Sequence, residues 1–264
     1  VLVREMGEER GIGLYRKYGD SFATEYQERF AAESAVLDIE RIEDVVRSND
    51  LRVNLYRPIE AAENELRFKI YSPGAPVPLS DVLPMLENLG LKVITENPYS
   101  VAPRDSDFTV RIHDFGVLVN GSFSLHEVRN KFQELFVRMW HDEVENDAFN
   151  HLVLLAGLDW REVVILRTYA RYMRQVGSAF SQDYMARTLA NNSALAASLV
   201  ELFVARFDPD RDAGLEEEAE AIEADIVRSL DDVMNPDEDR ILRAFLNLVQ
   251  SSLRTNFFQA GPDG

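Results

Sequence analysis

The chain has 264 residues, 46% apolar and 10% aromatic, which indicates a globular protein of one large or two ordinary domains. Its 46 acidic and 28 basic residues give a net charge of −18, which argues against nucleic-acid and anionic-membrane partners. The absence of cysteine excludes disulfides, zinc-thiolate sites and cysteine nucleophiles. We therefore expect a cytoplasmic protein with no nucleic-acid and no membrane partner.

The first 34 residues are expected to form a helical linker, the remnant of a preceding module. The chain opens with Val1 in mid-pattern and without a signal peptide, so we interpret it as a piece of a longer protein, and a lost targeting segment stays open. The stretch 1–5 suggests either a short strand or the tail of a missing element, broken off by Gly11 and Gly13. A helix over 21–33 follows, with Ser21 as its cap.

Residues 35–121 predict an α+β sandwich. Apolar residues recur at helical spacing over 35–47, and the period then changes to two over 51–57 and 65–72, which predicts a β-hairpin. A short helix over 81–89 is predicted, with Ser80 as its cap, Pro84 in its first turn and Gly90 just past its end, and strands over 91–101 and 107–119 follow a polar loop around Pro103 and Asp105. This order favours a ferredoxin-like antiparallel sheet with helices on one face.

Residues 122–264 predict an all-helical bundle that begins after Asn120-Gly121-Ser122. Helix-start patterns are found at Ser124-x-x-Glu127, Asp159-x-x-Glu162, Ser181, Asn191 or Asn192, and Asn235-Pro236. They predict helices over about 124–142, 148–155, 159–176, 182–190, 192–208, 213–233 and 237–256.

The helix over 159–176 is the element around which we expect this bundle to be organised. Its apolar positions cover about half of the helical circumference, which is wider than a surface helix needs. They are Val163, Ile165, Leu166, Tyr169, Ala170, Tyr172, Met173 and Val176. We therefore expect partners on at least two sides.

The segment Asp208–Asp239 contains 14 acidic and 2 basic residues and so contributes −12 to the net charge. A solvated helix face explains such a run. The alternative is that these carboxylates meet a basic surface elsewhere in a larger protein.

Motif searches for catalytic chemistry give no candidate. The sequence contains no G-x-G-x-x-G, G-x-x-x-x-G-K-[ST], H-E-x-x-H or G-x-S-x-G pattern. The tripeptide Asp114-Phe115-Gly116 lacks the other kinase motifs, and we expect it to end a strand. We assign no catalytic, cofactor-binding or metal-ligating residue.

The sequence contains four histidines, which are possible metal ligands. His141 and Glu145 stand at i, i+4, a spacing that can hold a metal, beside Asp142 and Glu143. A charged, exposed helix end also explains them and is the interpretation we adopt. The remaining histidines lack a second ligand at metal spacing and are not assigned; they are His113, His126 and His151.

Two further groups of residues keep two interpretations each. Arg167, Arg171 and Arg174 line one margin of the 159–176 helix and suggest either an anion site or salt bridges, for instance to the acids of 213–239. Glu87, Asn88 and Gly90 could line an effector crease of the sandwich, or Gly90 and Asn88 could simply terminate the helix.

The stretch AGLDWREVVILRTYARYMRQVG, with DAFNHLVLL before it and FSQDYMARTL after it, closely resembles the large NAD-dependent glutamate dehydrogenases of bacteria. The segments ENLGLKVITENPYSV and FTVRIHDFGV resemble the same family. The resemblance covers nearly the whole chain except the acidic part, 210–239.

This resemblance implies an ACT-type module over 35–119 and a helical module over 122–257. RTNFFQ (254–259) resembles the segment that leads into the catalytic part of the family. The Gly- and Lys-rich substrate motif and the NAD-binding Rossmann domain lie beyond Gly264 in that family. The implied parent enzyme oxidises L-glutamate to 2-oxoglutarate and ammonium with NAD. No catalytic residue of the family maps onto this chain, and no cofactor is expected in this segment.

We expect a non-catalytic regulatory and assembly segment that forms a homo-oligomer and contacts the catalytic domain of the same chain. An amino acid is the candidate effector, as in other ACT-type modules. The alternatives are a purely structural oligomerisation module without a ligand and a stand-alone amino-acid-binding regulator.

Overall fold

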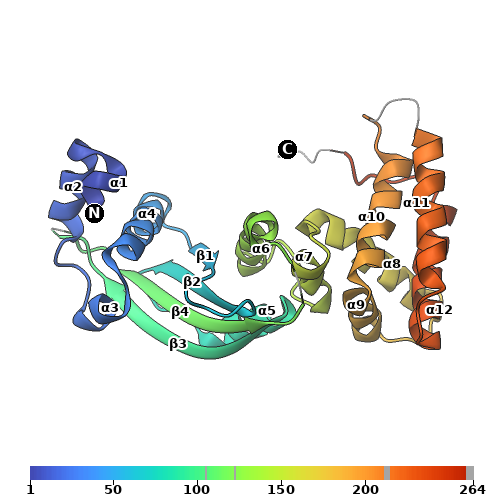
Figure 1. Ribbon diagram of the computed structural model, residues 1–264, viewed down its shortest axis with the longest axis horizontal. Coiled ribbons are helices and arrows are strands. Elements are labelled where there is room, and N and C mark those ends of the chain that lie inside the picture. The colour runs from blue at the N-terminus through green and yellow to red at the C-terminus, as the bar shows by residue number, and fades with distance from the viewer. Residues whose placement is uncertain (105, 122, 211–214, 260–264) are drawn as a thin grey trace. The chain divides into compact units, whose positions relative to one another are not determined.

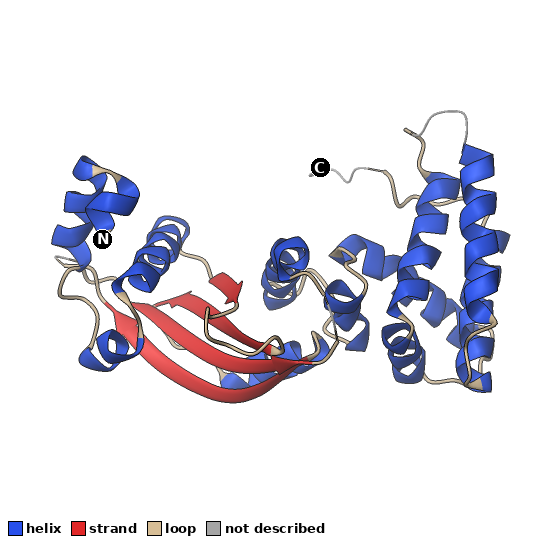
Figure 2. Cartoon of the chain, in the orientation of Figure 1, coloured by secondary structure: helices blue, strands red, loops and turns tan. Residues whose placement is uncertain are grey.

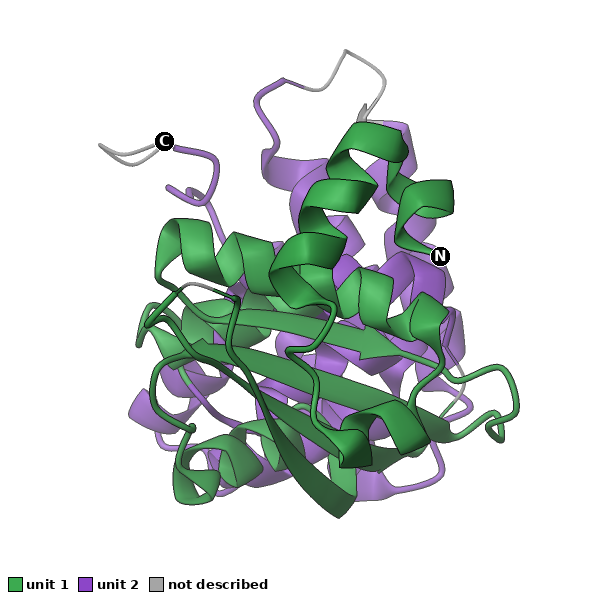
Figure 3. Cartoon of the chain, turned by 90° about the vertical axis from the view of Figure 1, so that its left-hand side faces the viewer, with its two compact units in different colours: residues 1–121, 133–145 green, residues 122–132, 146–264 purple. Residues whose placement is uncertain are grey.

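A computed structural model describes residues 1–104, 106–121, 123–210 and 215–259 (Figure 1). The chain divides into two compact units, which Figure 3 colours separately. Unit 1 comprises Val1–Gly121 and Gln133–Glu145, and unit 2 comprises Ser122–Phe132 and Asn146–Gly264. The helix α6 (Leu125–Trp140) is therefore divided between the two units.

Unit 1 contains a four-stranded sheet and the helices that cover it (Figure 2). Its elements in chain order are α1 (Leu2–Met6), α2 (Glu8–Tyr18), α3 (Thr24–Arg29), α4 (Ala32–Ser48), β1 (Arg52–Tyr56), β2 (Glu65–Pro73), α5 (Leu79–Asn88), β3 (Leu91–Val101) and β4 (Val110–Val119). The α+β class and the antiparallel ferredoxin-like sheet are confirmed.

The strand order is β1-β2-β4-β3, and all neighbouring strands pair antiparallel. β2 and β3 therefore run parallel to each other and are connected through α5, with β4 between them. This is the split β-α-β arrangement of ferredoxin-like folds. The last strand of the chain thus fills the centre of the sheet.

Helices cover both faces of the sheet, and the prediction of helices on one face is wrong. β2 is buried without interruption from Phe68 to Ser72, whereas a half-solvated strand alternates. Phe68 packs against Phe136 of α6, with ring centroids 4.8 Å apart. The next residue, Lys69, points to the opposite face and reaches α4. The continuous burial of β2 therefore reflects packing against helices on both faces of the sheet.

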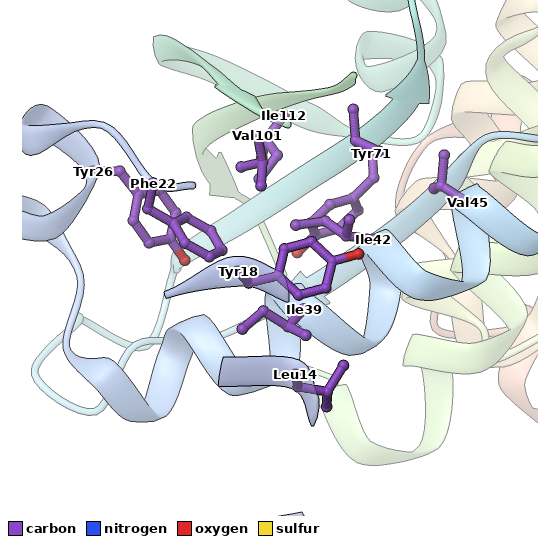
Figure 4. Close-up of a cluster of buried hydrophobic side chains, with 11 residues drawn as sticks. Leu14, Tyr18, Phe22, Tyr26, Ile39, Ile42, Val45, Tyr71, Val101 and Ile112 are labelled. Atoms are coloured by element: carbon purple, nitrogen blue, oxygen red, sulfur yellow. The ribbon is translucent and has the colours of Figure 1, made fainter. Parts of the chain in front are cut away.

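The face toward α4 carries a hydrophobic cluster that Figure 4 shows in detail. Tyr71 and Ile112 of the sheet contact Ile39 and Ile42 of α4, and Tyr18 closes the cluster from α2. The apolar positions of the predicted helix over 35–47 therefore face the sheet, as the spacing indicates.

The N-terminal stretch is helical, and the predicted strand over 1–5 is wrong. α1 and α2 occupy 2–6 and 8–18, so Gly11 and Gly13 lie inside a helix. A Cβ on Gly11 would lie 2.6 Å from the Cα of Val3, so the glycine permits the two short helices to pack closely. Glycine here serves packing rather than termination.

Three predicted helix starts in unit 1 are displaced. α3 begins after Ala23, and Ser21 instead donates its hydroxyl to the carbonyl of Lys17. Phe30 is extended and separates α3 from α4, which begins at Ala32 and crosses the predicted boundary after residue 34. α5 begins at Leu79, so Pro84 lies inside it rather than in its first turn.

Unit 2 is helical throughout its described part. Apart from α6, its elements are η1 (Ala148–His151), α7 (Leu152–Leu155), α8 (Trp160–Gln175), α9 (Gln182–Asn191), α10 (Ser193–Phe207), α11 (Leu215–Leu230) and α12 (Pro236–Ser251). The helical bundle is confirmed. The predicted residues Asp105, Ser122, 213 and 214 lie outside the described residues.

Side chains start α8, α9 and α12 as predicted. Asp159 accepts the N–H of Glu162, whose carboxylate accepts the N–H of Asp159, and the two bonds form a complete capping box. Ser181 caps α9 and Asn235 caps α12, with Pro236 at the first helical position.

The expected central position of α8 holds for most of its apolar arc. Val163, Leu166 and Ala170 are fully buried. Tyr172 and Val176 are 50% and 63% exposed, so the arc is narrower at the C-terminal end than predicted.

Candidate functional site

A row of polar residues crosses the sheet on the face toward α4. The strand register places Asn54 of β1 beside Lys69 of β2, Lys69 beside Asp114 of β4, and Asp114 beside Asn97 of β3. Residues paired directly across antiparallel strands lie on the same face. Every strand thus contributes one polar residue to this face of the sheet.

Asp38 of α4 is the centre of the hydrogen bonds on this face. Its carboxylate accepts a bond from the ammonium of Lys69 at 2.5 Å and one from the hydroxyl of Tyr71 at 2.6 Å. The hydroxyl of Tyr26 donates a third bond to it. Asp38 and Lys69 are 2% and 1% exposed, so this is a fully buried ion pair.

Aromatic rings enclose the Lys69 ammonium on its remaining sides. It lies 3.9 Å from the ring centroid of Phe30 and 5.6 Å from those of Tyr26 and Tyr56. Such cation–π contacts stabilise a desolvated charge.

Burial shifts the pKa of the groups around this pair. It lowers the pKa of the Lys69 ammonium, while the negative charge of Asp38 opposes that shift. It raises the pKa of the Tyr71 hydroxyl and raises that of Tyr56 to about 12. Because substrate cannot reach these buried groups, we interpret the network as the attachment of α3 and α4 to the sheet.

A second ion pair lies beside the first. The guanidinium of Arg67 makes two bonds to the carboxylate of Asp114, and burial lowers the pKa of Arg67. Gly116 lies next to it, and a Cβ there would approach the hydroxyl oxygen of Thr95 to 2.5 Å. A cavity of about 340 Å³ adjoins this site. Arg67 lines this cavity, but its charge is already neutralised by Asp114.

This network was not predicted from the sequence. Asp38 stands on the apolar side of a helix, whereas Lys69 falls on the polar positions of its alternating strand, in phase with Glu65 and Arg67. The out-of-pattern charge of Asp38 was the available signal, since a buried charge requires a partner.

The predicted arginine stripe does not act as one group. Arg167 is 3% exposed and binds Asp147 with N–O distances of 2.7 and 3.0 Å and Asn150 at 2.7 Å. Arg174 is exposed and donates to the backbone carbonyls of Ser178 and Phe180. Arg167 therefore has a structural role, in which it binds Asp147 and Asn150.

The i, i+4 geometry proposed for His141 and Glu145 is not realised. α6 ends at Trp140, and Asp142 has a left-handed φ of +57°, so the two side chains do not share a helix face. His141 instead lies 3.0 Å from Asp50. Within the described residues, no group of three or more His, Asp or Glu side chains could hold a metal ion.

The other histidines are held by local contacts. The Nε2 of His113 accepts the N–H of Val77 at 3.3 Å, so Nδ1 carries the proton that bonds Glu96 at 2.8 Å. Burial lowers the pKa of His151. Asp114-Phe115-Gly116 lies inside β4, and the prediction that it ends a strand is wrong.

Helix termination accounts for Gly90, which was weighed as part of an effector crease. It has a φ of +83°, and its N–H donates to the carbonyl of Glu87 at 2.9 Å. These features are typical of a glycine that follows a helix.

The described residues include no single helix long and apolar enough to cross a membrane. α9 and α10 would reach that length and hydropathy only together, and they are bent by 101° at their junction.

Comparison with protein-family models gives four matches in succession. Residues 1–45 match helical motif 2 of glutamate dehydrogenase, 50–129 match its ACT3 domain, and 144–209 match its helical motif 3. Residues 225–264 match the catalytic domain of bacterial NAD-glutamate dehydrogenase. The chain belongs to the family of bacterial NAD-specific glutamate dehydrogenases.

The chain is similar to proteins named NAD-specific glutamate dehydrogenase from three bacteria. The chain is 42% identical to that of Halomonas elongata over 264 residues and 38% identical to that of Pseudomonas aeruginosa over 269 residues. It is 34% identical to that of Mycobacterium tuberculosis over 249 residues. These matches cover 99%, 100% and 91% of the chain but only 16%, 16% and 15% of the relatives.

The segments of glutamate dehydrogenase differ in extent from those inferred from the sequence. The helical motif 2 model includes most of α4, which the sequence analysis assigned to the ACT-type module. The match to the catalytic-domain model begins at residue 225, whereas the catalytic part was expected to begin only at residues 254–259. α12 thus falls within the catalytic-domain match.

Proposed function

We propose that this chain is the regulatory and assembly part of an enzyme that oxidises L-glutamate to 2-oxoglutarate and ammonium with NAD in the cytoplasm. One observation carries the proposal. Three successive segments match an ACT domain and two helical motifs, and the catalytic-domain match begins only at residue 225.

The use of charged groups supports a non-catalytic role. The buried Lys69 and Arg167 are each bound to a carboxylate, Asp38 and Asp147. A general base or nucleophile must reach the substrate, whereas these groups hold helices in place. We place the NAD site, the substrate motif and the reaction in the remainder of the catalytic domain.

Turnover assays test this division of labour. We expect no glutamate- and NAD-dependent formation of NADH by the 264-residue chain, and activity only when the remainder of the catalytic domain is present. Turnover or bound NAD in the isolated chain would contradict the proposal.

Assembly through the sheet is a second candidate function. β3 is an eleven-residue edge strand, and most of its residues are exposed or half-buried. Edge strands can pair with a second copy, although Pro98 and the bulge between Val93 and Thr95 restrict such pairing. This reading requires no ligand.

Thermal-shift measurements with amino acids, combined with sedimentation, separate the two functions. Saturable stabilisation by an amino acid supports an effector-binding regulator. Concentration-dependent dimerisation without any ligand effect supports a purely structural module.

A further inference from the structure

A cavity of about 480 Å³ lies in unit 2 between α8, α10 and the segment that follows α12. Trp160 to Tyr169 form one wall, Phe203 contributes from α10, and residues 252–259 form the opposite wall. This volume lies within the range of about 300–1,000 Å³ that is typical of small-molecule sites.

Three kinds of contact hold the segment 252–259 in place. The hydroxyls of Tyr169 and Ser252 are 2.7 Å apart, and the guanidinium of Arg161 donates to the carbonyl of Phe257 at 2.5 Å. The rings of Phe203 and Phe257 lie edge to face at 5.7 Å. Specific contacts therefore fix the position of the cavity wall that this segment forms.

The charge of the lining is basic, in contrast to the chain as a whole. Arg161 and Arg254 line the cavity, and its described lining includes no aspartate or glutamate, although the chain has a net charge of −18. Arg161 uses one of its five N–H donors on Phe257. Arg254 has no hydrogen bond or ion pair with any residue in the described ranges.

Other arginine-lined cavities differ in this respect. Arg67 is bound by Asp114, and Arg52 and Arg138 are bound by Asp50 and Glu143. Among the described residues, none occupies the donors of the Arg254 guanidinium, which we assign to a ligand.

The remainder of the lining combines rings with neutral donors. Trp160 and Phe257 supply aromatic surface, and the amides of Asn256 and Gln259 supply hydrogen-bonding groups. Sites for small organic molecules combine apolar walls with a few polar groups in this way.

We propose that this cavity binds a small organic anion whose phosphate or carboxylate group contacts Arg161 and Arg254. Its flat or apolar body packs against Trp160 and Phe257. Both anionic groups match the planar guanidinium, which binds either with two parallel hydrogen bonds.

The position of the cavity gives this binding a consequence for regulation. One wall belongs to the helical motif 3 match and the other to the catalytic-domain match. A ligand that contacts both walls favours the arrangement in which they are docked. This consequence rests on the proposed function, whereas the binding itself does not.

The test uses the fluorescence of Trp160 in the 264-residue chain carrying Trp140→Phe, because Trp140 is the only other tryptophan. Adenosine 5′-monophosphate and phenylacetate serve as the phosphate and carboxylate probes. Adenosine and inorganic phosphate are the controls that lack the charge and the apolar body.

We expect saturable quenching by at least one anionic probe, weaker binding at high salt, and little effect of adenosine or inorganic phosphate. The probe that binds identifies the anionic group. Arg254→Gln should weaken binding about tenfold or more, because it removes a charge-assisted hydrogen bond. Arg240→Gln is the matched control, since Arg240 is exposed and lies outside the cavity.

The absence of saturable quenching by both anionic probes would overturn the proposal. Equal affinity of the Arg254→Gln variant and its parent would do the same. Neither result affects the turnover assay, so a failure of this inference is distinguishable from a failure of the proposed function.

Discussion

Replacing Lys69 by methionine is the most direct test of the network between α4 and the sheet. The substitution keeps most of the side-chain volume but removes the ammonium, which lies 2.5 Å from a carboxylate that is 2% exposed. Removal of one partner from a buried ion pair costs about 3–5 kcal/mol, because the remaining charge stays buried. We expect unit 1 to lose that amount of unfolding free energy.

Urea unfolding measures this loss. Trp140 lies in unit 1 and Trp160 in unit 2, so a Trp160→Phe background makes fluorescence report on unit 1. With a denaturant dependence of about 2 kcal/mol per M, the midpoint should fall by about 2 M.

A double variant keeps the test informative even where the single variant unfolds. Asp38→Asn in the Lys69→Met background removes the isolated charge and keeps an oxygen that accepts bonds from Tyr26 and Tyr71. We expect it to be more stable than Lys69→Met alone by about 2 kcal/mol. A single variant within about 1 kcal/mol of the parent, or a double variant no more stable than the single one, would refute the reasoning.

Three further substitutions or conditions are expected to have measurable effects. Arg167→Leu should destabilise unit 2 by about 3–5 kcal/mol in urea unfolding, because it breaks the buried ion pair with Asp147. The control Arg171→Leu, on the exposed side of α8, should cost about 1 kcal/mol or less. Equal losses in the two variants would contradict the structural role of Arg167. Gly116→Ala should lower the free energy of unfolding by about 1–3 kcal/mol, because the new methyl group crowds Thr95. Adding Thr95→Ala should restore much of this loss. A double variant whose loss equals the sum of the two single losses would argue against this contact. Folding raises the pKa of Tyr56 to about 12. The contribution of its protonated hydroxyl to the free energy of unfolding is therefore complete below about pH 10 and is lost between about pH 10 and 12. Tyr56→Phe should flatten that part of the stability profile measured by alkaline denaturation.

Local patterns were sufficient to predict much of the fold. The alternation over 51–57 and 65–72 identifies β1 and β2, and the predicted strand over 91–101 coincides with β3. Asp159 and Glu162 mark the start of α8 because a capping box is a contact between near neighbours.

Features that depend on distant residues were not predicted. Asp38 and Lys69 are 31 positions apart, and residues 160–169 meet 252–259 only in the folded unit. The strand predicted over 1–5 is a five-residue helix whose packing depends on Gly11. Such short segments carry little periodicity, so tertiary contacts decide their conformation.

The position of β4 has a consequence for how the sheet forms during synthesis. β2 and β3 leave the ribosome first, but each pairs with β4, which is completed only at Val119. Until then the β1–β2 hairpin and β3 have no strand to join them. A nascent chain stalled before Val110 would therefore expose two unpaired strand edges to chaperones or to other nascent chains.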